Sequence, residues 1–146
     1  MNEDVVAVLV RQGALRVRQK DLERIKSLIT SAERDALAAK SVLLNDETAT
    51  LVFRGIYEPM RQLGDACWWL VGYEPADHQT SLESLKDLDI KEKIRLNFID
   101  RFRKIRNDAN YRGMRVTTAQ AREILEFWDK CCVEIVRYLC KKLQLY

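Results

Sequence analysis

Residues 21–44 read DLERIKSLITSAERDALAAKSVLL, and apolar residues recur through this stretch at alternating intervals of three and four. An α-helix places residues at these intervals on one face, so the pattern predicts a long helix that begins at Asp21 and buries one stripe. The small alanines of the stripe would let a neighbouring helix approach closely, which is typical of a helical bundle. The stripe consists of Leu22, Ile25, Ile29, Ala32, Ala36, Ala39 and Leu43.

A second long helix is predicted from about residue 48 to residue 71. Asn45 and Asp46 end the first helix and can cap the second. Pro59 lies inside this helix and lacks a backbone N–H group, so we expect a kink there. Trp68 and Trp69 project about 100° apart on a helix. Either both fill the core, or one fills it while the other meets a neighbouring helix or a second subunit.

Later helices are indicated by residue pairs with the spacing of a capping box, in which side chains three positions apart cap one helix end. The first pair opens a short helix near 81–85, after a loop marked by Gly72, Pro75 and Asp77. The second pair opens a helix that should fray near 111–113, and the third pair opens the last helix. The pairs are Thr80 with Glu83, Asp89 with Glu92, and Thr117 with Gln120. The apolar stripe of the last helix is Ile124, Trp128, Cys131, Ile135 and Tyr138.

These patterns predict an all-α fold, an up-and-down bundle of four principal helices with one short inserted helix. The 5 glycines and 2 prolines of the chain leave few turns for a β-sandwich or barrel. At 146 residues the chain has the size of one domain. We assign residues 21–146 to the bundle. Residues 1–20 form an N-terminal segment that docks on the bundle or on a partner, and its apolar part, 5–10, fits a short helix or a strand.

Composition narrows the chemistry and the compartment. The net charge of +3 tolerates a polyanionic partner but does not by itself indicate one. No apolar run approaches the roughly 18 residues of a membrane span, and the N-terminus lacks the basic residues of a secretory signal. We therefore expect a cytoplasmic protein with no membrane association. The chain has 4 cysteines without a C-x-x-C pair and a single histidine, so we expect no metal site, no cofactor, and reduced, mostly buried thiols.

Residues 101–113, RFRKIRNDANYRG, form the densest polar cluster of the chain. Arg103, Arg106, Asn107 and Asn110 share one helix face. Guanidinium groups bind phosphate with forked hydrogen bonds, and neighbouring amides can orient a base or a sugar. The cluster therefore predicts a site for RNA or a nucleotide, with a plain solvated basic face as the alternative. The opposite face should pack into the core through Ile94, Phe98, Phe102 and Ile105.

The spacing within this cluster resembles the signature of HEPN domains. In that superfamily an arginine and a polar residue are followed, after a short spacer, by a histidine. Arg106 and Asn107 match the first two positions, whereas Tyr111 stands where the histidine is expected. The run SAERDALAAKSVLL resembles the long first helix of the family. The run FRGIYEPMRQLGDACWWLVGYEPADHQTSLESL resembles its second helix, its turn and its short third helix, so the resemblance spans roughly residues 21–139.

The resemblance implies metal-independent RNA cleavage, in which the ribose 2′-hydroxyl attacks the adjacent phosphate. Carried over, Arg106 would contact the phosphate and Asn107 would position it, and two subunits would pair so that their motifs meet in one cleft. A tyrosine hydroxyl has a pKa near 10, against about 6.5 for histidine, so Tyr111 is a poor general base at neutral pH. We therefore expect weak cleavage at most. Tyr111 could move a proton, stack on a base or simply pack on the bundle.

Three further side chains have alternative roles. His78 could restore proton transfer and contact nucleic acid if the loop before the third helix folds over Arg106, or it could be an ordinary residue at a helix start. Arg54 and Arg61 lie seven residues apart and share one face. They could line the same cleft, but we favour exposed ion pairs with Glu58 or Asp65.

Taken together, the residues and the resemblance predict an RNA-binding HEPN-like protein. Its catalytic residues would be Arg106, Asn107 and Tyr111, with Arg103, Asn110 and His78 as further nucleic-acid contacts. It could act as a weak ribonuclease in a toxin–antitoxin or defence system, as a homodimer with a cognate antitoxin. The alternative is a non-catalytic helical module that docks a nucleotidyltransferase-like protein, and a third possibility is a dimeric scaffold without a ligand.

Overall fold

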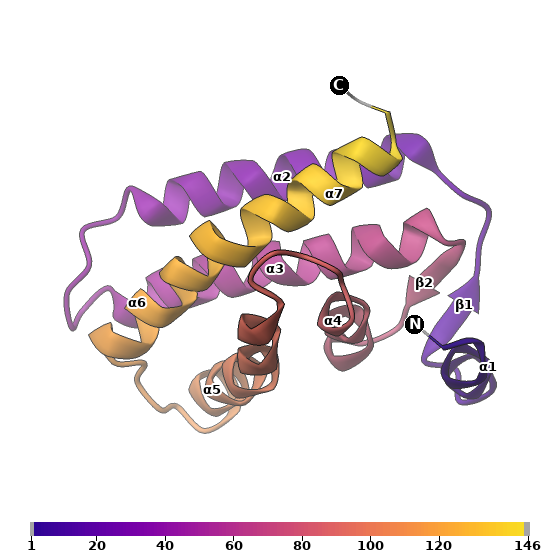
Figure 1. Cartoon of the computed structure of the whole chain (residues 1–146). Helices are drawn as coiled ribbons and strands as arrows, with labels where there is room; N and C mark the ends of the chain where they lie inside the picture. Colours follow the sequence, from indigo (N-terminus) through magenta and orange to yellow (C-terminus); the bar gives the residue numbers. More distant parts are fainter. Residues whose placement is uncertain (1, 145–146) are drawn as a thin grey trace.

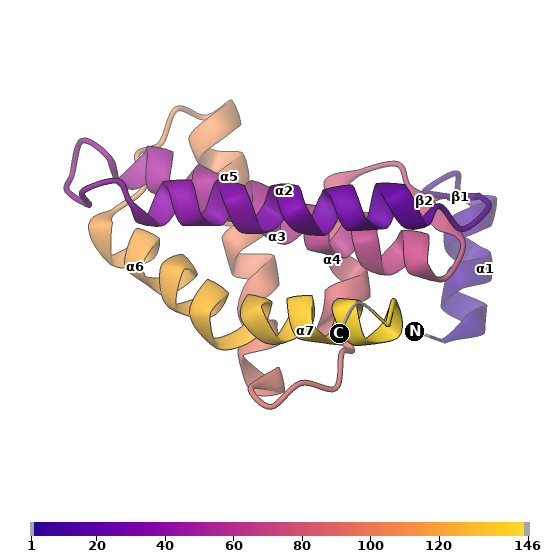
Figure 2. The ribbon, with the colours of Figure 1, turned by 90° about the horizontal axis from the view of Figure 1, so that it is seen from above.

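The computed structural model describes residues 2–144, and these residues are mostly helical (Figure 1). Several helices lie lengthwise beside one another, whereas two others run across them on the side of α3 that faces away from α2 (Figures 1 and 2). The lengthwise helices are α2 (Leu22–Lys40), α3 (Ala49–Leu70), α6 (Thr118–Phe127) and α7 (Val133–Lys142). The crossing helices are α4 (His78–Lys86) and α5 (Ile99–Tyr111). The predicted all-α helical bundle is confirmed; the last two residues of the range assigned to it, 145–146, lie outside the described residues.

Helix α3 is the centre of the bundle and contacts α2, α4, α5, α6 and α7. The middle of the predicted α2 stripe is buried, from Ile25 to Ala39. The prediction that Leu22 and Leu43 belong to the core was wrong, since their side chains are 47% and 79% exposed. Leu22 is the first residue of α2, and Leu43 follows the end of that helix. A methyl group at Gly55 would lie 2.8 Å from Cβ of Ala39, so small residues on both helices permit the close approach of α2 and α3.

Both tryptophans of α3 are buried within the chain. Trp69 belongs to the main core, and the Arg24 guanidinium lies 4.4 Å from the centre of its ring. Trp68 packs edge-on against Tyr73 and donates a hydrogen bond of 2.6 Å from Nε1 to the carbonyl oxygen of Thr80. Neither ring therefore requires a second subunit, and the homodimer stays a prediction. Helix α3 continues through the buried Pro59, where the expected kink also stays a prediction.

The N-terminal segment contains a helix and a strand. Helix α1 (Glu3–Arg11) precedes β1 (Leu15–Val17), which pairs in antiparallel register with β2 (Tyr73–Pro75), so that Leu15 lies opposite Pro75. The prediction of a plain loop at 73–75 was wrong. The strand forms only because a partner 56 to 60 residues away in the sequence supplies its hydrogen bonds. Leu15 is 2% exposed and joins this small sheet to the body of the molecule.

One predicted cap is confirmed and another is shifted. Thr117 and Gln120 form a complete capping box at the start of α6. The N-cap of α4 is Asp77 rather than Thr80: its carboxylate accepts the Thr80 N–H at 2.7 Å, and Thr80 itself is buried inside the helix. Helix α4 thus begins at His78, earlier than predicted, because an aspartate upstream supplies the capping oxygen.

The segments on either side of these helices also differ from the expectation. Glu92 precedes a 3-10 helix, Lys93–Phe98, and α5 starts only at Ile99. With this change of helix type, Ile94 faces outward and is 79% exposed, and Phe98 is 40% exposed. The prediction that these two residues pack into the core was therefore wrong. Phe102 is fully buried and Ile105 partly buried, as predicted.

Two further end regions depart in detail from the sequence pattern. Before α3, the Asn45 side chain accepts the backbone N–H groups of Glu47 and Thr48, so it shapes the turn, while Thr48 occupies the N-cap position without a capping bond. The last helix is interrupted by a π-helical turn, Trp128–Cys132, and the side chain of Trp128 is buried. Tyr138, further along the stripe, is only partly buried.

Three of the four cysteines are buried, and all four are free thiols. Burial raises the pKa of the Cys67 thiol to about 12, which keeps it protonated at neutral pH. Within residues 2–144, no helix combines the length and apolar character that crossing a bilayer requires.

Candidate functional site

An open pocket of about 320 Å³ lies between the start of α4 and the C-terminal half of α5. It brings together every residue that the sequence analysis placed in the site except Asn110. Helix α5 supplies two arginines, an amide and a tyrosine, and α4 supplies the histidine. The lining residues are Asp77, His78, Gln79, Arg103, Arg106, Asn107 and Tyr111.

Asn110 points to a different part of the molecule. Arg54 of α3 donates from Nε to the Asn110 side-chain oxygen at 2.7 Å and from Nη2 to the carbonyl oxygen of Ala109 at 3.3 Å. These bonds tie the end of α5 to α3. The expected ion pair of Arg54 with a neighbouring carboxylate was therefore wrong, because an amide and a helix-end carbonyl occupy its donors. Asn110 does not line the pocket, and its contact with nucleic acid stays a prediction.

Arg106 lies between aromatic rings. Its guanidinium carbon is 5.6 Å from the centre of the Tyr57 ring and 5.9 Å from the centre of the Tyr111 ring, distances typical of cation–π contacts. Its Nη1 group lies 3.4 Å from the Asn107 side-chain oxygen. Among residues 2–144, no carboxylate forms an ion pair with Arg106 or with Arg103. Aromatic faces hold the cation in place without consuming its N–H donors, so the donors other than the one directed at Asn107 remain available to an anion.

Tyr111 is the last residue of α5 and is 77% exposed. This exposure rules out the alternative that its ring simply packs on the bundle. An exposed aromatic ring beside unpaired arginines is the arrangement on which single-stranded nucleic-acid bases stack.

His78 lies at the start of α4 and also in the pocket with Arg106. Its ring centre is 6.4 Å from that of Tyr57. Burial lowers the pKa of His78 below 6.5, and the positive charges of Arg61 and Arg106 lower it further. The imidazole is therefore neutral at pH 7 and can accept a proton. His78 is also the first residue of α4, whose cap is provided by Asp77.

Tyr57 of α3 is a pocket neighbour that the sequence did not indicate. It is 1% exposed, its ring stacks beside Phe53, and its hydroxyl has no hydrogen-bond partner among the described residues. Burial raises the pKa of this hydroxyl to about 12, although the charges of Arg106 and Arg103 oppose the rise. A tyrosine within an apolar helix face normally indicates core packing, and the one available signal was its position four residues before Arg61 on the same face.

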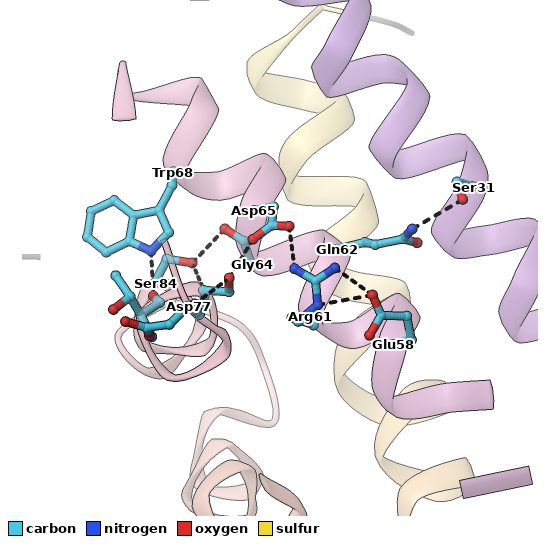
Figure 3. A network of polar contacts seen from close by, with 11 residues as sticks. Ser31, Glu58, Arg61, Gln62, Gly64, Asp65, Trp68, Asp77 and Ser84 are labelled. Atoms are coloured by element: carbon cyan, nitrogen blue, oxygen red, sulfur yellow. Dashed lines mark hydrogen bonds and ion pairs between the residues drawn. The ribbon is translucent and has the colours of Figure 1, made fainter. Parts of the chain in front are cut away.

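The neighbouring arginine of α3, Arg61, is fully paired (Figure 3). It donates from Nη1 to Asp65 at 2.7 Å and from Nε to Glu58 at 3.0 Å, which confirms the expected ion pairs. The pairs are more buried than predicted, since the side chains of Arg61 and Asp65 are only 20% and 16% exposed. Burial raises the pKa of Glu58, but the hydrogen bond and charge of Arg61 outweigh it, and the net pKa is lowered. Arg61 is therefore neutralised and offers no free cation to the pocket.

Metal ligands do not cluster in the described part of the chain: residues 2–144 contain no group of three or more His, Cys, Asp or Glu side chains that could hold an ion. Comparison of the chain with protein-family models, with curated proteins and with solved structures found no match. The likeness to HEPN domains therefore depends on the residues of the motif and their surroundings.

Proposed function

We propose that this chain is a HEPN-like RNA-binding protein whose pocket holds phosphate groups of single-stranded RNA. The observation that carries the proposal is the meeting, in one open pocket, of Arg103 and Arg106 without carboxylate partners among residues 2–144. Guanidinium groups bind phosphate oxygens with two parallel hydrogen bonds. The exposed ring of Tyr111 supplies a surface on which a neighbouring base stacks.

The same pocket supports slow, metal-independent cleavage as part of the proposal. Arg106 would stabilise the charge that develops on the phosphate when the ribose 2′-hydroxyl attacks it; the bond between phosphorus and the 5′-oxygen then breaks, and the leaving 5′-oxygen takes a proton from water. His78 is neutral and lies in the same pocket, so it is the better proton acceptor, and Tyr111 keeps a stacking role. A place in a toxin–antitoxin or defence system, and action as a homodimer, follow from the HEPN resemblance and belong to the proposal.

Fluorescence anisotropy with a labelled single-stranded RNA tests the binding. Arg106→Met should weaken binding by about tenfold, which is 1.4 kcal/mol. The matched control is Arg34→Met, which removes the same charge from an exposed position on α2 and should change affinity by less than about twofold. The wild-type affinity should fall as salt rises, because phosphate contacts release counterions. Equal binding by the wild type and Arg106→Met contradicts the site.

A cleavage assay separates the two possible proton carriers. If the RNA is cut, His78→Ala should lower the rate at least tenfold, whereas Tyr111→Phe should change it little. The reaction should persist in EDTA and leave a cyclic phosphate. Cleavage that survives Arg106→Met contradicts the mechanism. Tight binding to a nucleotidyltransferase-like protein, with no RNA bound or cut, favours the docking module instead.

A further inference from the structure

Two hydrogen-bond donors close to the pocket have no acceptor among the described residues. The Tyr57 hydroxyl and the Nε atom of Arg103 are both buried, and neither makes a hydrogen bond to any residue in the range 2–144. Nearly all buried polar groups in folded proteins have a partner, so two orphaned donors in one neighbourhood call for an explanation. Each is a donor that an anionic oxygen can satisfy.

The surroundings place both donors close to the pocket. The Tyr57 ring lies against Arg106 and His78, which line the pocket, and Arg103 lines it as well. The positive charges of Arg106 and Arg103 both act on the Tyr57 hydroxyl. The Tyr57 ring therefore lies against side chains that line the pocket, and its hydroxyl lies within the field of both arginines.

The other polar groups of the pocket also favour an anion. His78 and Gln79 form the first turn of α4, whose N-terminus carries a partial positive charge. The nearest carboxylates are already occupied. Asp77 accepts the N–H group of Thr80, and Glu58 accepts from Arg61. The two arginines are the cations of this lining, and both carboxylates named above already accept a hydrogen bond, so the lining favours an anionic ligand such as a phosphate oxygen over an amine.

We infer that the Tyr57 hydroxyl and Arg103 Nε form an inner subsite for one non-bridging oxygen of a phosphate group, with Arg106 covering the same group from the pocket side. This inference rests on the proposed function and deepens it, because it names a phosphate-positioning residue on α3 outside the arginine motif. Tyr57 donates one hydrogen bond and takes no part in proton transfer, since its raised pKa keeps it protonated.

Titration with inorganic phosphate tests the subsite, and the imidazole NMR signals of His78, the only histidine in the chain, report binding. The wild type should show a saturable shift. Tyr57→Phe should weaken phosphate binding at least threefold. Without phosphate, the thermal unfolding temperature of this variant should equal or exceed that of the wild type, because the substitution removes only an unpaired buried hydroxyl. Arg103→Lys, which keeps the charge but removes the Nε donor, should weaken it similarly. Tyr138→Phe, on the partly buried face of α7, is the matched control and should change nothing.

The outcomes separate the subsite from RNA binding. Equal phosphate affinity of the wild type and Tyr57→Phe overturns the subsite, as does the absence of any phosphate binding. If Tyr57→Phe weakens phosphate binding but the wild type binds no single-stranded RNA, the subsite stands and the proposed function falls. If Tyr57→Phe weakens RNA and phosphate binding by similar factors, the phosphate in the subsite belongs to the RNA. If RNA binding depends on Arg106 but not on Tyr57, the proposed function stands and the inner subsite is wrong.

Discussion

The crossing of α3 and α4 and the neighbouring pocket use similar residues in opposite ways. At the crossing, Arg61 is shared between two carboxylates, and Ser84 donates to the carbonyl oxygens of Gly64 and Ser81 at 2.9 Å each (Figure 3). In the pocket, Arg106 contacts the rings of Tyr57 and Tyr111 and the side-chain oxygen of Asn107, and the Tyr57 hydroxyl has no acceptor among the described residues. Satisfied polar groups hold helices together, whereas unsatisfied ones remain available for a ligand.

The largest expected effect is at the crossing itself. A methyl group at Gly64 would lie 2.2 Å from the carbonyl oxygen of Ser81, which is backbone and cannot move aside cheaply. Gly64→Ala should therefore lower the free energy of unfolding by about 3 kcal/mol. Urea denaturation measures it. Gly113→Ala is the control, because Gly113 has a positive φ of 65° but no neighbour within 4 Å, and its cost should be about 1 kcal/mol. Equal costs would show that α3 and α4 do not cross this closely.

Removal of one arginine from each region sharpens the comparison. Arg61→Met leaves two partly buried carboxylates without their cation, so stability should fall by about 2 kcal/mol after allowance for solvent screening. Arg106→Met removes no ion pair among the described residues and should cost less than about 1 kcal/mol. Chemical denaturation of both variants in one buffer is the measurement. The reverse order of stabilities would mean that Arg106 is structural.

The pKa of His78 reports the positive field of the pocket. Burial and then the charges of Arg61 and Arg106 lower this pKa, so Arg106→Met should move it upward, and Arg34→Met should leave it unchanged. NMR titration of the imidazole measures the shift. Because the folded chain binds this proton less readily than the unfolded chain, the contribution of His78 to stability is complete above about pH 6.5 and falls as the pH drops through the lowered pKa. A pKa that does not respond to Arg106→Met places the two side chains too far apart to act together.

The smallest expected effect is at Tyr111. Tyr111→Phe keeps the stacking ring, so the affinity for RNA should change by less than about twofold and the free energy of unfolding should hardly change. Tyr111→Ala removes the ring and should weaken RNA binding about fivefold or more. Anisotropy titrations of both variants measure this difference. A large loss in Tyr111→Phe would instead assign a role to the hydroxyl.

The regular part of the fold was predictable because its signals are local. The three-four spacing of Ile25, Ile29 and Ala32 specifies one buried helix face, and Thr117 with Gln120 specifies one helix start, without knowledge of distant residues. The β1–β2 pair was not predictable, since three residues near the N-terminus and three after α3 become strands only when they meet. The helix type of 93–98 depends likewise on packing, which is why the exposure of Ile94 was unexpected.

The candidate site was predictable to the extent that one helix carries it. Arg103, Arg106 and Asn107 share a face of α5, and their spacing places them together. The position of His78 in the pocket depends on where α4 begins, and the cap provided by Asp77 sets that start. Tyr57 could not be recognised, because a buried hydroxyl without a partner is a property of the folded chain and not of the tyrosine in its sequence.

A titration of the isotopically labelled protein with a short single-stranded RNA, followed through its backbone amide NMR signals, tests the central claim most directly. The claim is that the unpaired polar groups of the pocket bind phosphate. We predict that the largest shifts occur in residues 77–79 and 103–111, and that residues 30–37 of α2 do not respond. The absence of any shift, or shifts centred on α2 and α7, would contradict the claim.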